Sequence, residues 1–183
     1  MIVCDLLSKD DLRMVNKNFK NRKVTICVAN NTWFDRRSWY EPMTSVPILT
    51  AILKDKVNLS LIDANCEGLT LEETKKMLVS LQPEICLITA LSVEYYKSYH
   101  AFAQLAKDVN PECTVVMGGV YPTTLAEEVI KDGNVDYAFM GHAEERIDKF
   151  VSYILGNSKA EIRLFPGIAY HLKLPTLKIT TAP

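Results

Sequence analysis

Short apolar runs alternate along the chain with longer segments in which apolar residues recur every three or four positions. A short apolar run bounded by polar residues is typical of a β-strand, whereas the longer spacing is typical of one face of a helix. A helical pattern follows each apolar run, so the sequence predicts five strand–helix units. The predicted strands cover residues 24–29, 57–62, 85–91, 114–117 and 137–140.

The pattern within individual runs predicts where each strand lies in the sheet. Residues 85–91 are almost continuously apolar, as expected for a strand that is covered on both faces. Residues 57–62 alternate apolar and polar side chains, which favours an edge position. Helix starts are predicted at Thr70 and Thr124, because a glutamate follows each of them three residues later, the spacing of a capping box.

These elements predict an α/β fold, with a doubly wound, flavodoxin-like (Rossmann-like) parallel sheet of five strands in the order 2-1-3-4-5. Three regions are expected: an N-terminal extension over residues 1–22, the α/β domain over 23–156, and a C-terminal strand and linker over 157–183. In such sheets ligands bind outside the carboxyl ends of the strands. The segments that follow those ends are 30–42, 92–95, 118–122 and 141–145.

Composition narrows the function classes. Hydrophobic residues make up 48% of the chain and the formal net charge is −1, so the chain has no basic field that would attract nucleic acid. No apolar run approaches the roughly 18 residues that span a bilayer, and the first residues do not form a secretory signal. We therefore expect a cytoplasmic protein with neither nucleic acid nor membrane as a partner.

The cysteines indicate structural thiols. The five cysteines form no closely spaced pair, which predicts reduced thiols and no metal site. No C-x-x-x-C-x-x-C motif is present, so the chain is not expected to hold a radical-type iron–sulfur cluster through that motif.

The loops disfavour four common ligands of this fold. Residues 29–34 contain no glycine, whereas a dinucleotide, a P-loop nucleotide or a flavin phosphate requires a tight, glycine-containing loop after the first strand. A phospho-receiver domain needs acidic residues after the first strand, an aspartate at the end of the third and a lysine at the end of the fifth. Asn30, Ala90 and Gly141 stand at those places.

A pair of glycines, Gly118 and Gly119, ends the fourth predicted strand. Two residues without side chains allow a bulky group to lie against the backbone. The same pair also suits a tight turn between a strand and a helix. The pair alone leaves both interpretations open.

Several segments together resemble the cobalamin-binding domain family, in the subgroup fused to radical S-adenosylmethionine enzymes. Residues 115–123, Val-Val-Met-Gly-Gly-Val-Tyr-Pro-Thr, resemble a strand of that subgroup that ends in Gly-Gly before a His-Pro-Thr-like segment. Residues 135–144, Val-Asp-Tyr-Ala-Phe-Met-Gly-His-Ala-Glu, resemble its Val-Asp-Tyr strand and Gly-Glu-Gly-Glu turn. Residues 89–91 stand where the family often has Ser-x-Leu, and residues 167–170 resemble the segment that leads toward the radical domain. The resemblance covers roughly residues 23–172.

The resemblance implies cobalamin as the cofactor, with no catalytic residue and no metal ligand in this chain. The nucleotide tail of the cofactor would enter a slot beside Gly118 and Gly119, where Thr89 and Ser92 offer hydroxyl groups. The D-x-H-x-x-G motif of other cobalamin domains is absent after the first strand, so no histidine ligand to cobalt is expected there. The implied cofactor-binding residues are Thr89, Leu91, Ser92, Val93, Gly118, Gly119, Tyr121, Pro122, Gly141, His142 and Glu144.

The same resemblance implies a cofactor-carrier domain of a radical S-adenosylmethionine enzyme, with methyl transfer as the expected reaction. The radical domain would follow in cis and would hold the [4Fe-4S] cluster and S-adenosylmethionine. Residues 180–183 look like a linker that has been cut before such a domain.

Two alternatives stay open. The first alternative to cobalamin binding is a flavodoxin-like interaction or regulatory domain that has lost cobalamin binding. The second is a domain that holds a different nucleotide tail in the same slot. An open apolar slot beside Gly118 and Gly119 favours cobalamin, whereas side chains that fill it favour a degenerate domain.

Five aromatic or histidine residues carry competing interpretations. His142 either meets a metal or the tail phosphate, or is a surface histidine near a helix start. Trp33 and Trp39 either cover the corrin or a partner domain, or close over the sheet. His100 and His171 are expected to be structural.

Overall fold

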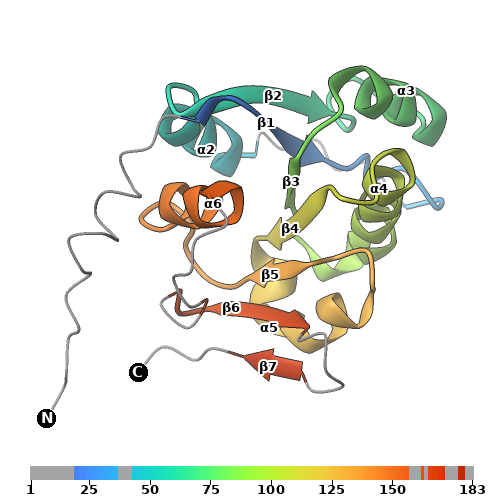
Figure 1. Cartoon of the computed structure of the whole chain (residues 1–183). Helices are drawn as coiled ribbons and strands as arrows, with labels where there is room; N and C mark the ends of the chain where they lie inside the picture. Colours follow the sequence, from blue (N-terminus) through green and yellow to red (C-terminus); the bar gives the residue numbers. More distant parts are fainter. Residues whose placement is uncertain (1–18, 37–42, 157–161, 163–164, 172–176, 180–183) are drawn as a thin grey trace, which may run out of the picture.

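The computed structural model describes residues 19–36, 43–156, 162, 165–171 and 177–179. Within these ranges the chain forms one seven-stranded sheet in the order β2-β1-β3-β4-β5-β6-β7 (Figure 1). The first five strands are parallel, and the last two are antiparallel to their neighbours. The strands are β1 (Phe19–Val28), β2 (Val57–Asp63), β3 (Ile85–Thr89), β4 (Thr114–Gly118), β5 (Tyr137–Phe139), β6 (Ile168–His171) and β7 (Leu177–Ile179).

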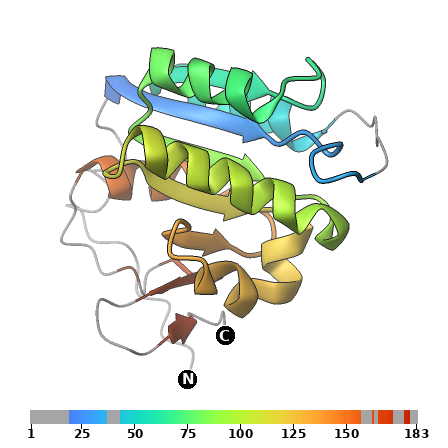
Figure 2. The ribbon, with the colours of Figure 1, turned by 90° about the vertical axis from the view of Figure 1, so that its right-hand side faces the viewer.

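Helices cover both faces of the sheet, as Figure 2 shows from the side of α3, α4 and α5. α2 and α6 pack on the opposite face. None of the helices in the described ranges has the length and apolar run needed to cross a membrane. The helices are α2 (Ser45–Leu53), α3 (Leu71–Leu81), the 3-10 helix η1 (Val93–Tyr95), α4 (Tyr96–Val109), α5 (Val120–Lys131) and α6 (Ile147–Gly156).

The predicted fold class and the order 2-1-3-4-5 are confirmed. β2 lies at the edge, as its alternating pattern indicates, and all five residues of β3 are buried. The predicted count of five strands is wrong, because the segment after α6 adds β6 and β7. These strands are short, and they return antiparallel without the crossover helix that a parallel strand requires.

One of the two predicted capping boxes is confirmed. The Thr70 hydroxyl accepts a bond from Glu73 N (3.3 Å), and the Glu73 carboxylate accepts one from Thr70 N (2.9 Å). Bonds from the Thr70 backbone and hydroxyl also lower the pKa of Glu73. The predicted capping box at Thr124 does not form. α5 begins at Val120 and has a kink at Leu125, where the backbone is not helical, and the Thr124 hydroxyl donates to the Val120 carbonyl (2.9 Å).

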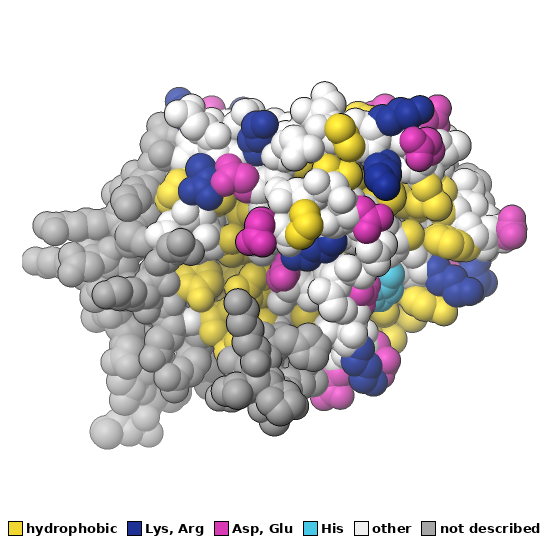
Figure 3. Space-filling model, turned by 45° about the vertical axis from the view of Figure 1, so that its right-hand side comes forward, with side chains coloured by type: hydrophobic (Ala, Val, Ile, Leu, Met, Phe, Trp, Pro, Cys, Tyr) yellow, Lys and Arg dark blue, Asp and Glu magenta, His cyan; other side chains and the backbone are white. Residues whose placement is uncertain are grey.

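The charges of the surface are mixed. Figure 3 shows acidic and basic side chains interspersed over the visible face, without a continuous basic patch among the residues coloured there.

Buried cysteines behave as part of the core. The Cys86 and Cys113 sulfurs lie 3.7 Å apart, and the contact with Cys86 together with burial holds the pKa of the Cys113 thiol well above its usual range. A thiol that resists ionisation is a poor nucleophile, which agrees with a structural role.

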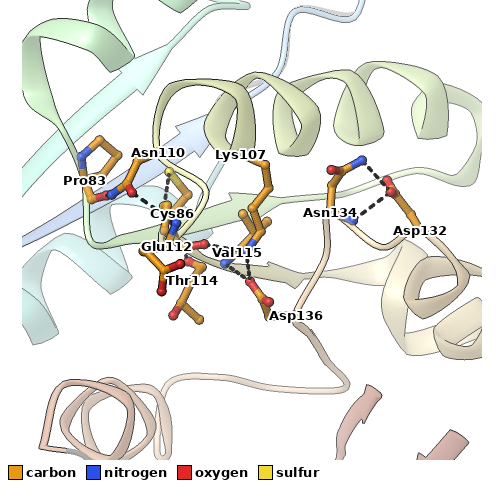
Figure 4. Close-up of polar contacts among 11 residues, drawn as sticks. Pro83, Cys86, Lys107, Asn110, Glu112, Thr114, Val115, Asp132, Asn134 and Asp136 are labelled. Carbon is orange, nitrogen blue, oxygen red and sulfur yellow. Dashed lines mark hydrogen bonds and ion pairs between the residues drawn. The ribbon is translucent and has the colours of Figure 1, made fainter. Parts of the chain in front are cut away.

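A polar network ties the amino ends of β3, β4 and β5 together (Figure 4). Lys107 Nζ on α4 donates to Asp136 Oδ2 and to the Cys113 carbonyl, both at 2.7 Å. Asp136 Oδ2 also accepts a bond from Val115 N at 2.7 Å. Asn110 Nδ2 donates to the Pro83 carbonyl at 3.2 Å. These charged groups therefore hold the sheet at the edge opposite the one where ligands bind.

Candidate cofactor-binding site

A cavity of about 340 Å³ opens at the carboxyl ends of β3, β4 and β5, beneath α2 and α6. Its floor is formed by Leu87 and Val116, which lie opposite each other on adjacent strands. Leu49 of α2 and Ile147 of α6 close it from above, and Phe139 of β5 forms one side. All five of these side chains are buried and apolar.

One level above the floor, three aligned residues form a row across the sheet. Thr89 of β3 pairs with Gly118 of β4, and Gly118 pairs with Phe139 of β5. Because side chains alternate along a strand, position 118 faces the same side as Val116, the side of the cavity. A Cβ atom at position 118 would meet only Phe139, at an ordinary 3.8 Å. The packing of the protein thus does not require glycine there, yet its absence of a side chain keeps the cavity open.

The neighbouring Gly119 has a different role. Its φ is +115° and its ψ is −161°, a conformation that is essentially restricted to glycine. A Cβ atom would lie 2.6 Å from the Ala90 carbonyl oxygen. That oxygen accepts a bond from Tyr121 N (3.0 Å), and Ala90 N donates to the Gly118 carbonyl (2.7 Å). The turn interpretation is therefore confirmed at Gly119, and Gly118 leaves the open space that the other interpretation requires.

The structure brings seven of the eleven implied residues together around the cavity. The seven that line it are Thr89, Leu91, Gly118, Gly119, Gly141, His142 and Glu144.

Ser92, Val93, Tyr121 and Pro122 do not line it. The Ser92 hydroxyl accepts a bond from Glu94 N (3.2 Å) and starts η1. Tyr121 and Pro122 are buried, because α5 begins directly after Gly119 and its first turn directs the Tyr121 ring to the α4 face of the sheet.

Two hydroxyl groups add polarity to the site. Thr89 is buried, and its hydroxyl contacts the Met43 sulfur at 3.0 Å and the Cys27 carbonyl at 3.5 Å. Thr123 was not singled out from the sequence. Its hydroxyl donates to the Gly119 carbonyl (2.6 Å) and accepts a bond from Gly141 N (2.9 Å). Thr123 thus joins the loops that follow β4 and β5.

Arg146, at the start of α6, is the second residue that the sequence analysis missed. Its guanidinium donates to the carbonyls of Met140 (2.9 Å), His142 (2.7 Å) and Pro166, and it lies 4.6 Å from the centre of the Phe139 ring. Burial lowers the pKa of Arg146. The signal in the sequence is that a basic residue stands beside a helix start, where the helix dipole favours acidic residues. A basic residue in such a place suggests that it has another role.

Replacing Arg146 with methionine is expected to destabilise the chain by roughly 2–3 kcal/mol, because three carbonyl groups lose their donor. Unfolding in urea, followed by circular dichroism, measures this loss. Lys149→Met is the matched control, since Lys149 is exposed on the same helix. Equal midpoints for the two variants would show that Arg146 does not hold the loop.

The histidines and tryptophans are now placed. The His142 side chain is 99% exposed at the rim, with Nδ1 3.8 Å from Glu144 Oε2. No group of three or more metal-ligating side chains occurs in the part of the chain that is described. Trp33 is buried and donates from Nε1 to the Leu69 carbonyl (2.9 Å), so it closes over the sheet. Trp39 and the side chain of His171 lie outside the described residues.

On the opposite face of the sheet, which α4 and α5 cover, polar side chains join the loops near the site. His100 Nδ1 lies 2.6 Å from Asp132 Oδ2, and its Nε2 lies 3.0 Å from the Tyr121 hydroxyl. The Tyr99 hydroxyl accepts a bond from Ser92 N (3.3 Å). Burial raises the pKa of both tyrosines, so their hydroxyls stay protonated. His100 accordingly has the structural surroundings that were expected for it.

The chain is a doubly wound domain with an open cavity at the carboxyl edge of its sheet. A model of the B12 binding domain family matches residues 42–151, more than half of the chain. The chain belongs to this family, and it resembles the cobalamin-binding domains of cobalamin-dependent radical S-adenosylmethionine enzymes.

Three similar proteins illustrate the match. The anaerobic magnesium-protoporphyrin IX monomethyl ester cyclase of Rubrivivax gelatinosus is 28% identical over 124 residues, which cover 67% of this chain and 22% of the cyclase. The cobalamin-dependent S-adenosylmethionine radical enzyme OxsB has a TM-score of 0.70 at 16% identity, over 88% of this chain and 22% of OxsB. The radical S-adenosylmethionine methyltransferase TsrM of Kitasatospora setae has a TM-score of 0.67 at 12% identity, over 87% of this chain and 30% of TsrM. The chain thus spans less than a third of each of these proteins.

Proposed function

We propose that this chain binds cobalamin and acts as the carrier domain of a cobalamin-dependent radical S-adenosylmethionine enzyme. The observation that carries the proposal is the apolar cavity beside Gly118, which no side chain of the described residues fills. A domain that had kept its fold and lost its ligand would be expected to close this space with larger side chains, because cavities destabilise a core.

The residues present fit the nucleotide tail of cobalamin. The volume of about 340 Å³ lies within the usual range of small-molecule pockets, and mostly apolar walls with few polar groups are typical of such sites. The buried part suits the flat base of the tail, with the Thr89 hydroxyl on one wall. Leu91 and Val120 are exposed apolar residues at the mouth, where they offer contacts to the corrin.

The chain contributes position and environment. Cobalamin, when bound, supplies a cobalt centre that can carry a methyl group, which is the chemistry of the cofactor itself. Asn30, which begins the loop after β1, donates from Nδ2 to the Leu69 carbonyl (3.1 Å), so this loop is fastened toward α3. Residues 29–42 contain no histidine, so the sequence of this loop offers no imidazole to cobalt.

The proposed enzyme is a methyltransferase, and the remaining parts are proposed from its relatives. We infer a radical S-adenosylmethionine domain in cis, which would hold the [4Fe-4S] cluster and S-adenosylmethionine. The exposed apolar residues at the carboxyl edge suit burial against such a domain, since exposed apolar groups often mark interaction surfaces.

An absorbance titration with hydroxocobalamin, followed by desalting, tests the proposal. The chain is expected to retain cobalamin at near-equal stoichiometry, with a dissociation constant in the micromolar range or below, roughly 8 kcal/mol or more of binding free energy. Bovine serum albumin passed through the same column controls for nonspecific carry-over. A folded chain that loses all cobalamin on desalting and shows no spectral change would contradict the proposal.

A further inference from the structure

We propose that the cavity selects corrinoids by the base of their nucleotide tail, and that it takes a benzimidazole in preference to a purine. Corrinoids share the corrin ring and differ in this base. The inference rests on the proposed function, because it assumes that the tail enters the cavity. It adds a preference that the buried surface of this particular chain imposes.

The deep end of the cavity is apolar on every side that the described residues form. Leu87 and Val116 make the floor, and Leu49 and Ile147 face them from the two helices. Phe139 lies one row above the floor, level with Gly118, and closes the side toward β5. The exposed fractions of these five side chains are 9% or less, so a group placed among them loses its contact with water.

The backbone at this depth offers little to a polar base. Leu87 pairs with both Ile26 and Val116, so this central strand spends its amides and carbonyls on the two neighbouring strands. Polar side chains lie higher. Thr89 is level with Gly118, one row above the floor, and Ser45 lies at the start of α2.

The two bases differ in how many polar atoms they bring. A benzimidazole that is linked to its ribose through one nitrogen carries a single further ring nitrogen, which one hydroxyl such as that of Thr89 can satisfy. Adenine in the same position carries four polar groups besides its linked nitrogen, namely three ring nitrogens and the exocyclic amine. Burying a polar group without a partner costs free energy. The apolar floor therefore penalises adenine and accepts the hydrocarbon edge of a benzimidazole.

Equilibrium dialysis of the chain against three corrinoids tests the inference. The probes are hydroxocobalamin, the corresponding adeninyl cobamide, and cobinamide, which lacks the nucleotide tail. We expect the adeninyl cobamide to bind at least about tenfold more weakly than hydroxocobalamin, a difference of roughly 1.4 kcal/mol. Cobinamide is expected to bind more weakly still.

The outcomes separate the inference from the proposed function. Equal affinity for hydroxocobalamin and the adeninyl cobamide would overturn the preference while cobalamin binding stands. Equal affinity for all three would show that the tail does not use the cavity, which also overturns the preference. If none of the three binds to a folded chain, both proposals fail.

A pair of adjacent valines supplies a matched control. Val116→Thr places a hydroxyl on the floor at nearly constant volume. The ratio of the dissociation constant of the adeninyl cobamide to that of hydroxocobalamin is expected to fall several-fold in this variant. Val115→Thr makes the same change on the opposite face of β4, within the core under α4 and α5, and should leave the preference unchanged. A preference that responds equally to both variants, or to neither, would contradict the role of the floor.

Discussion

The Gly118→Val variant is expected to remain folded and to lose cobalamin binding by at least about a hundredfold, equivalent to roughly 3 kcal/mol. Position 118 ends a strand, where valine is favoured, and the new Cβ would meet Phe139 only at an ordinary 3.8 Å. The two methyl groups of valine would then extend between Thr89 and Phe139, into the space proposed for the tail. The substitution thus closes the site without disturbing the packing around it.

Hydroxocobalamin titration of the variant measures the loss, and circular dichroism confirms the fold. Gly133→Val is the matched control, since a Cβ atom at Gly133 would meet nothing within 4 Å and the residue lies between α5 and β5. The control should bind like the unmodified chain. Undiminished binding by Gly118→Val would mean that cobalamin, if bound at all, does not use this cavity.

Much of the fold could be predicted, because the spacing of apolar residues records burial directly. The continuous run that contains β3 and the alternating run that contains β2 placed these strands at the centre and at the edge. The order of the strands then brought the ends of β3, β4 and β5 together, and with them Thr89 and Gly118. Phe139 completes this row but could not be singled out, since an apolar residue in a strand looks the same whether it lines a cavity or fills a core.

The remaining site residues depend on geometry that the sequence does not express. The capping-box rule selected Thr124 as the helix start, but a glycine at φ +115° lets α5 begin four residues earlier. With α5 beginning there, Tyr121 and Pro122 are buried and do not line the cavity. Arg146 acts through carbonyl groups of Met140, His142 and Pro166, and backbone acceptors leave no trace in residue types. In the core, the contact between Cys86 and Cys113 likewise joins positions far apart in sequence, which residue types alone do not predict.

The Gly119→Ala variant is expected to lose at least about 3 kcal/mol of stability, a large part of the total for a domain of this kind. Two effects add at this position. The backbone conformation is one that residues with a side chain rarely adopt, and the Cβ atom would approach the Ala90 carbonyl oxygen to 2.6 Å. Relief of that contact would break the bonds by which Ala90 joins Gly118 and Tyr121. Urea unfolding, or thermal unfolding with a drop of several degrees in the midpoint, measures the loss.

Gly68→Ala separates the two effects. Gly68 also has a positive φ, +63°, but a Cβ atom there would have nothing within 4 Å. Its substitution should therefore cost only the backbone strain, about 1 kcal/mol. If Gly119→Ala costs no more than Gly68→Ala, the close contact with Ala90 is absent and the turn after β4 is looser than described. A larger loss, together with the folded and non-binding Gly118→Val, would establish that adjacent glycines serve two purposes, one for the fold and one for the cofactor.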